Sequence, residues 1–151
     1  MAPDKCRRCK CTIPEGVHCE ECKQIIFQEN IEKQTNRALS KLRNSLSYGV
    51  GRVKEVADGR FWATAHDSCF RCSATETPAH YNKKFERWMH HRKAGRIVFC
   101  ELILKNNMGK PDLVVVDKGF IFIEEIVCTE KEASIYAKKG KYPFPINTIK
   151  V

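Results

Sequence analysis

Hydrophobic and polar positions follow two different rhythms along this 151-residue chain. Between residues 25 and 49 apolar side chains recur at steps of three and four, which predicts an amphipathic helix that ends near Gly49. From residue 96 onward the apolar residues come in short runs separated by turn-forming residues, as is typical of strands. The apolar stripe of the helix consists of Phe27, Ile31, Ala38, Leu39, Leu42 and Leu46.

A second helical pattern, "HYNKKFERWMHHRKAG", covers residues 80–95, after Pro78. We expect its apolar face to consist of Tyr81, Phe85, Trp88 and Met89. The opposing polar stripe, expected at the surface or facing phosphates, consists of His80, Lys84, Arg87 and His91. Six Lys and Arg residues against one Glu between residues 83 and 96 make this the most positive segment, so we expect nucleic-acid contacts from Lys83, Lys84, Arg87, His91, Arg92 and Lys93.

The strand-like runs are "RIVFCELIL", "PDLVVVD", "FIFIEEIVCT" and "KYPFPINTIKV", with a short helical segment, "EKEASIYAKKG", before the last. The resulting order, helix–strand–strand–strand–helix–strand, predicts an α/β or α+β layer with a mixed sheet. We expect three parts: a small module at 1–24, a helix and connector at 25–77, and the sheet-containing core at 78–151.

The composition of the chain indicates a basic surface and predicts a cellular location. The formal net charge is +9, and both halves of the chain carry an excess of Lys and Arg, which suits a polyanion such as nucleic acid. No apolar stretch approaches the roughly 18 residues of a membrane span, and "MAPDKCRRCKC" lacks the apolar core of a signal peptide. We therefore expect no membrane partner and a cytoplasmic location, where nine cysteines indicate metal ligands or free thiols.

The segment "CRRCKCTIPEGVHCEEC" contains two Cys-x2-Cys pairs on turn-rich sequence. Such pairs can surround one tetrahedral, structural Zn²⁺, whose binding would supply the folding energy of so short a loop. The predicted ligands are Cys6, Cys9, Cys19 and Cys22, and Cys11 or His18 could replace one of them. The segment resembles a zinc ribbon or a treble-clef knuckle.

A further thiolate pair lies in the connector. Its spacing permits a second zinc site with the ligands His66, Cys69, Cys72 and His80. Alternatively, the two cysteines of this pair complete a site with the N-terminal ones, or they are an inert, reduced pair.

Carboxylates stand at the margins of the strand-like runs: Glu101 in the first, Asp112 at the start of the second, and Glu124 and Glu125 at the end of the third. Neighbouring strands lie about 5 Å apart, so these side chains can converge at one margin of the sheet. Converging carboxylates repel one another unless a cation lies between them, and hard oxygen ligands suit Mg²⁺ or Mn²⁺. Such an ion can activate water for attack on a phosphodiester.

The pattern Glu…Pro-Asp…Glu, preceded by a basic helix, resembles the PD-(D/E)XK, or restriction-endonuclease-like, nuclease superfamily. Residues 78–149, with "HYNKK", "FCELIL", "GKPDLVVVD" and "IFIEEIVCT", are similar to the nuclease-like domain of the competence protein CoiA group. The resemblance implies an αβββαβ core, a divalent metal held by Asp112 and Glu125, a matching acid at Glu101, and Mg²⁺-dependent hydrolysis of DNA.

One position departs from this pattern. The superfamily expects Lys or Gln two residues after the last acid, where this chain has Val127, or Ile126 if Glu124 is that acid. Both faces of the third run are apolar, so alternation does not decide between the two glutamates, and similarity to the group favours Glu125. A lysine from elsewhere would then steady the scissile phosphate: Lys84 first, then Lys110 or Lys131.

The sequence thus predicts a metal-dependent endonuclease acting on DNA, including branched or single-stranded DNA, with a zinc module that helps to grip it. Many such nucleases are dimers, so a second copy of the chain is another expected partner. The first alternative is an inactive, zinc-containing DNA- or RNA-binding protein on the same fold. The second is a zinc-stabilised adaptor that binds proteins.

Overall fold

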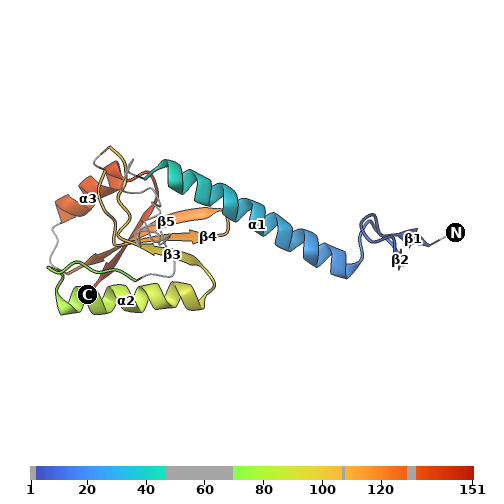
Figure 1. Ribbon diagram of the computed structural model, residues 1–151, viewed down its shortest axis with the longest axis horizontal. Helices are drawn as coiled ribbons and strands as arrows, with labels where there is room; N and C mark the ends of the chain where they lie inside the picture. The colour runs from blue at the N-terminus through green and yellow to red at the C-terminus, as the bar shows by residue number, and fades with distance from the viewer. Residues whose placement is uncertain (1–2, 47–69, 107, 129–131) are drawn as a thin grey trace, which may run out of the picture.

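The computed structural model describes residues 3–46, 70–106, 108–128 and 132–151 as a mixed α+β fold with a four-stranded sheet. Figure 1 shows helix α2, Pro78–Lys93, along one face of the sheet, and the C-terminal part of helix α1, Glu20–Asn44, against the other. The remainder of α1 leaves the sheet and leads to strands β1, Asp4–Lys5, and β2, Thr12–Ile13.

The sheet has the strand order β3-β4-β5-β6. Strands β3, Ile97–Cys100, and β4, Leu113–Asp117, pair antiparallel, as do β4 and β5, Phe120–Val127. Strand β6, Ile146–Lys150, lies parallel to β5, because the connection that contains helix α3, Glu132–Lys141, reverses the direction of the chain between them. The mixed sheet predicted from the sequence is therefore confirmed.

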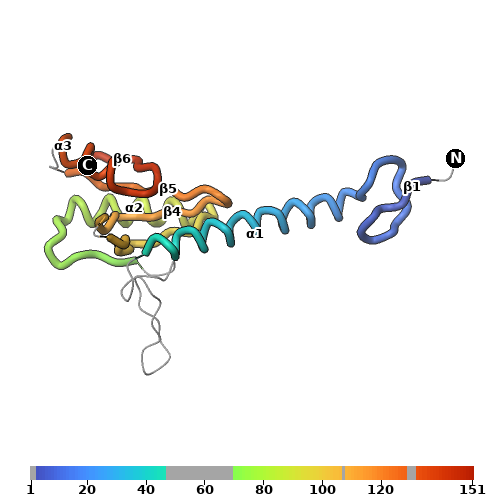
Figure 2. Tube along the Cα trace, turned by 90° about the horizontal axis from the view of Figure 1, so that it is seen from above, coloured from blue at the N-terminus to red at the C-terminus, as the bar shows by residue number. Residues whose placement is uncertain are grey.

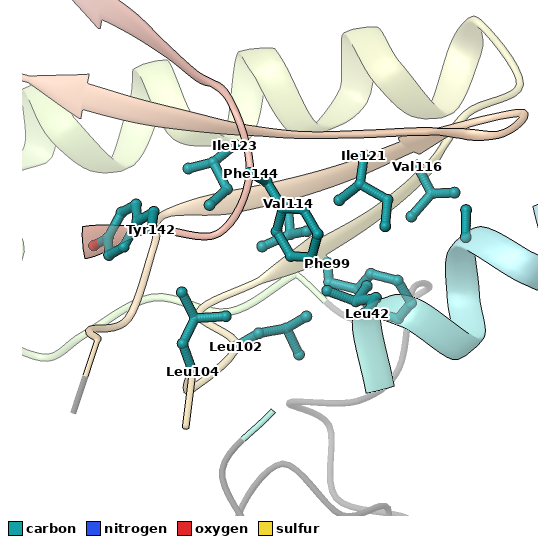
Figure 3. Packing of buried hydrophobic residues seen from close by; sticks show 11 residues of the cluster. Leu42, Phe99, Leu102, Leu104, Val114, Val116, Ile121, Ile123, Tyr142 and Phe144 are labelled. Carbon is teal, nitrogen blue, oxygen red and sulfur yellow. The ribbon is translucent and has the colours of Figure 1, made fainter. Parts of the chain in front are cut away.

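Side chains of β4 alternate between two hydrophobic cores. Val114 and Val116 point to the α1 side, where they join a cluster with Leu42 and Ile123 (Figure 3). Their neighbours on β4 point to the α2 side and pack with Trp88. Both cores are dry, since the valines and leucine of β4 are at most 1% exposed. A strand covered on both faces has no polar alternation, which explains the continuous apolar runs in the sequence.

Helix α1 packs on the sheet with only part of its length. Its N-cap is Cys19, whose side chain accepts a hydrogen bond from the backbone N–H of Cys22. Ala38 and Leu42 are buried against the sheet, whereas Phe27, on the same apolar stripe, is 65% exposed. Figure 2 shows the reason: the N-terminal part of the helix extends beyond the edge of the sheet.

Helix α2 begins at Thr77, whose hydroxyl accepts a hydrogen bond from the N–H of His80, and Pro78 occupies its first turn. Its orientation is not the predicted one. The polar stripe faces inward, with Lys84 fully buried and His91 2% exposed, because carboxylates of the sheet meet it there. Part of the expected apolar face lies outside instead.

The length and apolar character of the helices bear on whether any of them could cross a membrane. Among the helices in the described part of the chain, none combines the length and the apolar character that a membrane crossing requires.

Candidate functional site

The first candidate site is a cluster of cysteines at the free end of α1. The sulfur atoms of Cys6, Cys9, Cys19 and Cys22 all lie within 4.8 Å of one another. Three come from the loops around β1 and β2, and the fourth from the first turn of α1. This is the ligand set that the spacing predicted, and four thiolates at this separation could hold a metal such as zinc. Cys11, which is exposed, is not among them.

The electrostatics of this cluster fit a cation. Hydrogen bonding from the backbone N–H of Cys9, the largest of several causes, lowers the pKa of Cys6 to about 4. Burial raises the pKa of Cys22 to about 12. A metal ion is what would make both thiolates stable together, because it replaces the lost hydration of the buried one. The ring of His18 lies beside the cluster, with Nδ1 3.8 Å from the sulfur of Cys6.

The second zinc site predicted from the sequence has two ligands, His66 and Cys69, outside the described residues. Of the other two, Cys72 is exposed. The segment that contains it, green in Figure 1, lies beside α2 and far from the four N-terminal cysteines. His80 contacts two carboxylates instead.

Those carboxylates belong to Glu76, just before α2, and Asp112, just before β4. Together with His80 they form the second group in the described residues whose ligand atoms all lie within 4.8 Å of one another. Nδ1 of His80 is 2.6 Å from Oε1 of Glu76, and Nε2 is 3.3 Å from Oδ2 of Asp112. All three side chains are less than 20% exposed.

The contact between His80 and Glu76 is a close approach of a ring nitrogen and a carboxylate oxygen, which forms an ion pair if the histidine is protonated. Nδ1 of His80 and Oε2 of Glu76 are both buried and lack an aligned partner among the residues that the structure describes. Ligand atoms gathered within 4.8 Å of one another could hold a metal ion. A mixed nitrogen and oxygen donor set favours Mn²⁺ or another transition metal over Mg²⁺.

Asp112 is held in place by the neighbouring strand. It follows the buried Pro111, and its Oδ2 accepts a hydrogen bond of 2.8 Å from the backbone N–H of Ile126 on β5. The carboxylate therefore spans the ends of two strands.

Glu125 lies next to Asp112. Burial, and after it the charge of Asp112, raises the pKa of Glu125 to about 7. Its Oε2 accepts a hydrogen bond of 3.2 Å from Nζ of Lys138, on α3, and hydrogen bonding from Lys138 and Tyr142 partly offsets the rise in the pKa. The two carboxylates repel each other, and a cation bound by both would offset the repulsion.

Glu101 meets a lysine at this end of the sheet. Its backbone has a φ of 54°, a strained conformation for a glutamate. Nζ of Lys84 donates to Glu76 at 2.7 Å and to Glu101 at 3.3 Å. Although burial lowers the pKa of Lys84, these two carboxylates raise it above its ordinary value. Lys110 lies 3.8 Å from the other oxygen of Glu101.

Glu124 belongs to a different environment on the α2 face of β5. Arg87 donates two hydrogen bonds to its carboxylate, of 3.0 and 2.7 Å, and Nε2 of His91 lies 2.9 Å from Oε1. Glu124 is thus satisfied by its own partners, whereas Glu125 lies beside Asp112. The side chains of Arg87 and His91, expected to contact nucleic acid, are bound to this glutamate.

The remaining predicted residues lie around these groups. Lys83 forms an ion pair with Glu86, and Arg92 and Lys93 are exposed near the end of α2. Nucleic-acid binding by these three cations stays a prediction. Lys131 is outside the described residues, and Val127 is buried.

Sequence reasoning missed Glu76 and Lys138. Glu76 lies two residues before Pro78 and was part of the expected connector. Nevertheless Glu76, His80 and Lys84 stand at steps of four, which place them on one side of a helix and its cap. No sequence pattern indicated Lys138, because its proximity to Glu125 depends on where the connection between β5 and β6 places α3.

Comparison with known proteins adds no information about the chemistry of these residues. No protein-family model, curated protein or solved structure matches the chain.

Proposed function

We propose that this chain is a metal-dependent nuclease of the restriction-endonuclease-like type, which hydrolyses phosphodiester bonds of DNA. The observation that carries the proposal is the convergence of Glu76, His80 and Asp112 at one end of the sheet. Glu125 is not in that group, but the charge of Asp112 acts on it from the neighbouring strand. The order α2-β3-β4-β5-α3-β6 matches the αβββαβ order that the resemblance implies.

The donor atoms fit a divalent cation. Asp112 and Glu125 would hold it with His80, and Glu76 would either complete the ligand set or orient the ring of His80. When bound, such an ion lowers the pKa of a water molecule and stabilises the charge that develops on the phosphate. His80 favours Mn²⁺, since imidazole is a poor ligand for Mg²⁺.

Two lysines would have separate roles. The ammonium of Lys84 has no exposed surface and binds two carboxylates, so we assign it the positioning of Glu76 and Glu101. Lys138 is 32% exposed and 3.2 Å from Glu125, so its side chain can reach a phosphate at the site. It would supply, from α3, the cation that the superfamily places at the position of Val127.

The test is cleavage of plasmid, single-stranded and branched DNA with Mn²⁺ or Mg²⁺. We expect cutting that is faster with Mn²⁺ and that Asp112→Ala abolishes. Asp117→Ala is the matched control, because Asp117 stands at the other end of β4 and pairs with Arg96. Cutting by Asp112→Ala at the wild-type rate would refute the proposal.

Val127 supports one alternative, an inactive nucleic-acid-binding protein on the same fold. In that case wild-type protein would bind DNA with a steep dependence on salt and would cut none of these substrates with either metal. The zinc module and the basic residues of α2 would then serve binding alone.

A further inference from the structure

The outer side of α2 carries aromatic rings among its polar residues. Phe70, in the segment that leads to the helix, packs against Tyr81, Phe85 and Trp88, with ring centroids 5.4, 5.2 and 5.5 Å away. Phe85 and Trp88 are in addition stacked at 6.0 Å. We call these four residues the α2 aromatic cluster.

Only the inner part of the cluster serves the protein core. Trp88 is 8% exposed and packs with residues of β3 and β4. Tyr81 and Phe85 are 38% and 42% exposed, so a large part of each ring faces solvent. Large aromatic surfaces next to one another on a protein usually mark a binding site.

Cations lie beside the cluster on α2. Of the five Lys and Arg residues of this helix, Lys84 and Arg87 bind carboxylates on the inner side, Lys83 pairs with Glu86, and Arg92 and Lys93 are exposed. The guanidinium of Arg92 lies 5.0 Å from the centroid of the Trp88 ring, and Lys83 and Lys93 lie on the same helix. Exposed aromatic rings combined with cations are the features by which proteins bind single-stranded nucleic acids, since rings stack on bases and cations pair with phosphates.

The cluster also adjoins the candidate metal site. Nζ of Lys84 is 5.6 Å from the centroid of the Phe70 ring, and the same nitrogen donates to Glu76. His80, beside Glu76, directly precedes Tyr81. A strand that lay on the cluster would therefore have its backbone near the metal ligands.

We propose that the α2 aromatic cluster stacks on unpaired bases, so that the substrate of the site is a single-stranded segment of nucleic acid. Tyr81 and Phe85 are four residues apart, about 6 Å along the helix. This exceeds the 3.4 Å between stacked bases of a duplex strand, so the two rings suit an extended strand. In a duplex the faces of the bases are covered by their neighbours and cannot meet the rings.

This inference rests on the proposed function for the reaction, but binding tests it separately. The assay is fluorescence anisotropy without Mg²⁺ or Mn²⁺, with three labelled probes: a thymidine oligonucleotide, a duplex, and an abasic strand of the same length. We expect the thymidine strand to bind about tenfold or more tightly than the abasic strand, because each stacked base contributes a factor of about five to a hundred.

The variant is Tyr81→Leu with Phe85→Leu, which keeps apolar side chains against Phe70 and removes the stacking surface. It should bind the thymidine strand as weakly as the abasic one and leave duplex binding unchanged. Phe120→Leu is the matched control, since Phe120 is 71% exposed at the β4–β5 turn, away from α2. Single substitutions replace the double variant if it does not fold.

Equal binding of base-bearing and abasic strands by wild-type protein would overturn the inference, as would a double variant that binds like wild type. Cleavage separates this result from the proposed function. Base-dependent binding without cutting by any metal refutes the nuclease and leaves the stacking surface standing. If the double variant cuts single-stranded DNA at the wild-type rate, the stacking surface is refuted and the proposed nuclease function is not.

Discussion

Replacing Glu124 by glutamine should destabilise the fold strongly, although the two side chains have the same shape. The carboxylate is 2% exposed and receives hydrogen bonds from Arg87 and His91. Glutamine would leave the cation of Arg87 partly buried without a counter-charge, which is costly.

The magnitude follows from proton binding. Burial raises the pKa of Glu124, but hydrogen bonds from His91 and Arg87 outweigh it and lower the pKa to about 2. Against a glutamate pKa of about 4.3 in an unfolded chain, this corresponds to about 3 kcal/mol of stability at neutral pH. The contribution is fully present above about pH 4.3 and is lost as the pH falls toward 2, because the folded carboxylate then takes up a proton.

Urea unfolding followed by circular dichroism measures the difference. We expect the free energy of unfolding of Glu124→Gln to be about 3 kcal/mol below wild type at about pH 7, and the gap to narrow as the pH falls below about 4. A gap under about 0.5 kcal/mol at neutral pH would refute the role of this ion pair.

The adjacent residue provides the control. The pKa of Glu125 is raised to about 7, first by burial and then by the charge of Asp112, so its charged form opposes folding at neutral pH. Glu125→Gln, measured without added Mg²⁺ or Mn²⁺, should leave the free energy of unfolding unchanged or increase it. Equal decreases in the free energy of unfolding for Glu124→Gln and Glu125→Gln would contradict the difference between the environments of these two glutamates.

Two further predictions concern the N-terminal module and the loop before β4. Cys6→Ser should reduce the zinc content of purified protein from about one ion per chain, measured by colorimetric release, because a four-thiolate site loses a ligand; Cys128→Ser, at an exposed thiol, should not. Gly109→Ala should lower the free energy of unfolding by about 1 kcal/mol or more beyond Gly95→Ala. Both glycines have positive φ, but only at Gly109 would the new Cβ lie 2.9 Å from the ring of Tyr142, so equal losses would contradict this contact.

The sequence predicted the elements whose residues act locally. The two Cys-x2-Cys pairs indicated their cluster because four thiols within seventeen residues have few ways to meet. The apolar runs of β4 and β5 indicated buried strands, since their length and their turns are local properties. Even so, the periodicity of α1 could not tell where the sheet ends, and Phe27 shares a stripe with Leu42 although only the latter is covered.

The candidate site was predictable only in part, because it depends on pairing between distant segments. Both faces of β5 are apolar, so only the register and the packing of α2 distinguish Glu124 from Glu125. The orientation of α2 was also inaccessible. Hydrophobicity favoured burying Tyr81 and Phe85, but the carboxylates at the sheet margin attract Lys84 and His91 inward.

Helix α1 contains neither glycine nor proline in its 25 residues, so it has no built-in hinge. At 1.5 Å per residue it is about 37 Å long, and its outer end carries the four cysteines. The number of residues in the helix therefore sets both the distance of the cysteine cluster from the sheet and its direction around the helix axis. One residue inserted into its exposed stretch would rotate the cysteine cluster by about 100° around the helix axis. Four inserted residues would leave the cluster about 40° from its first direction and about 6 Å farther from the sheet.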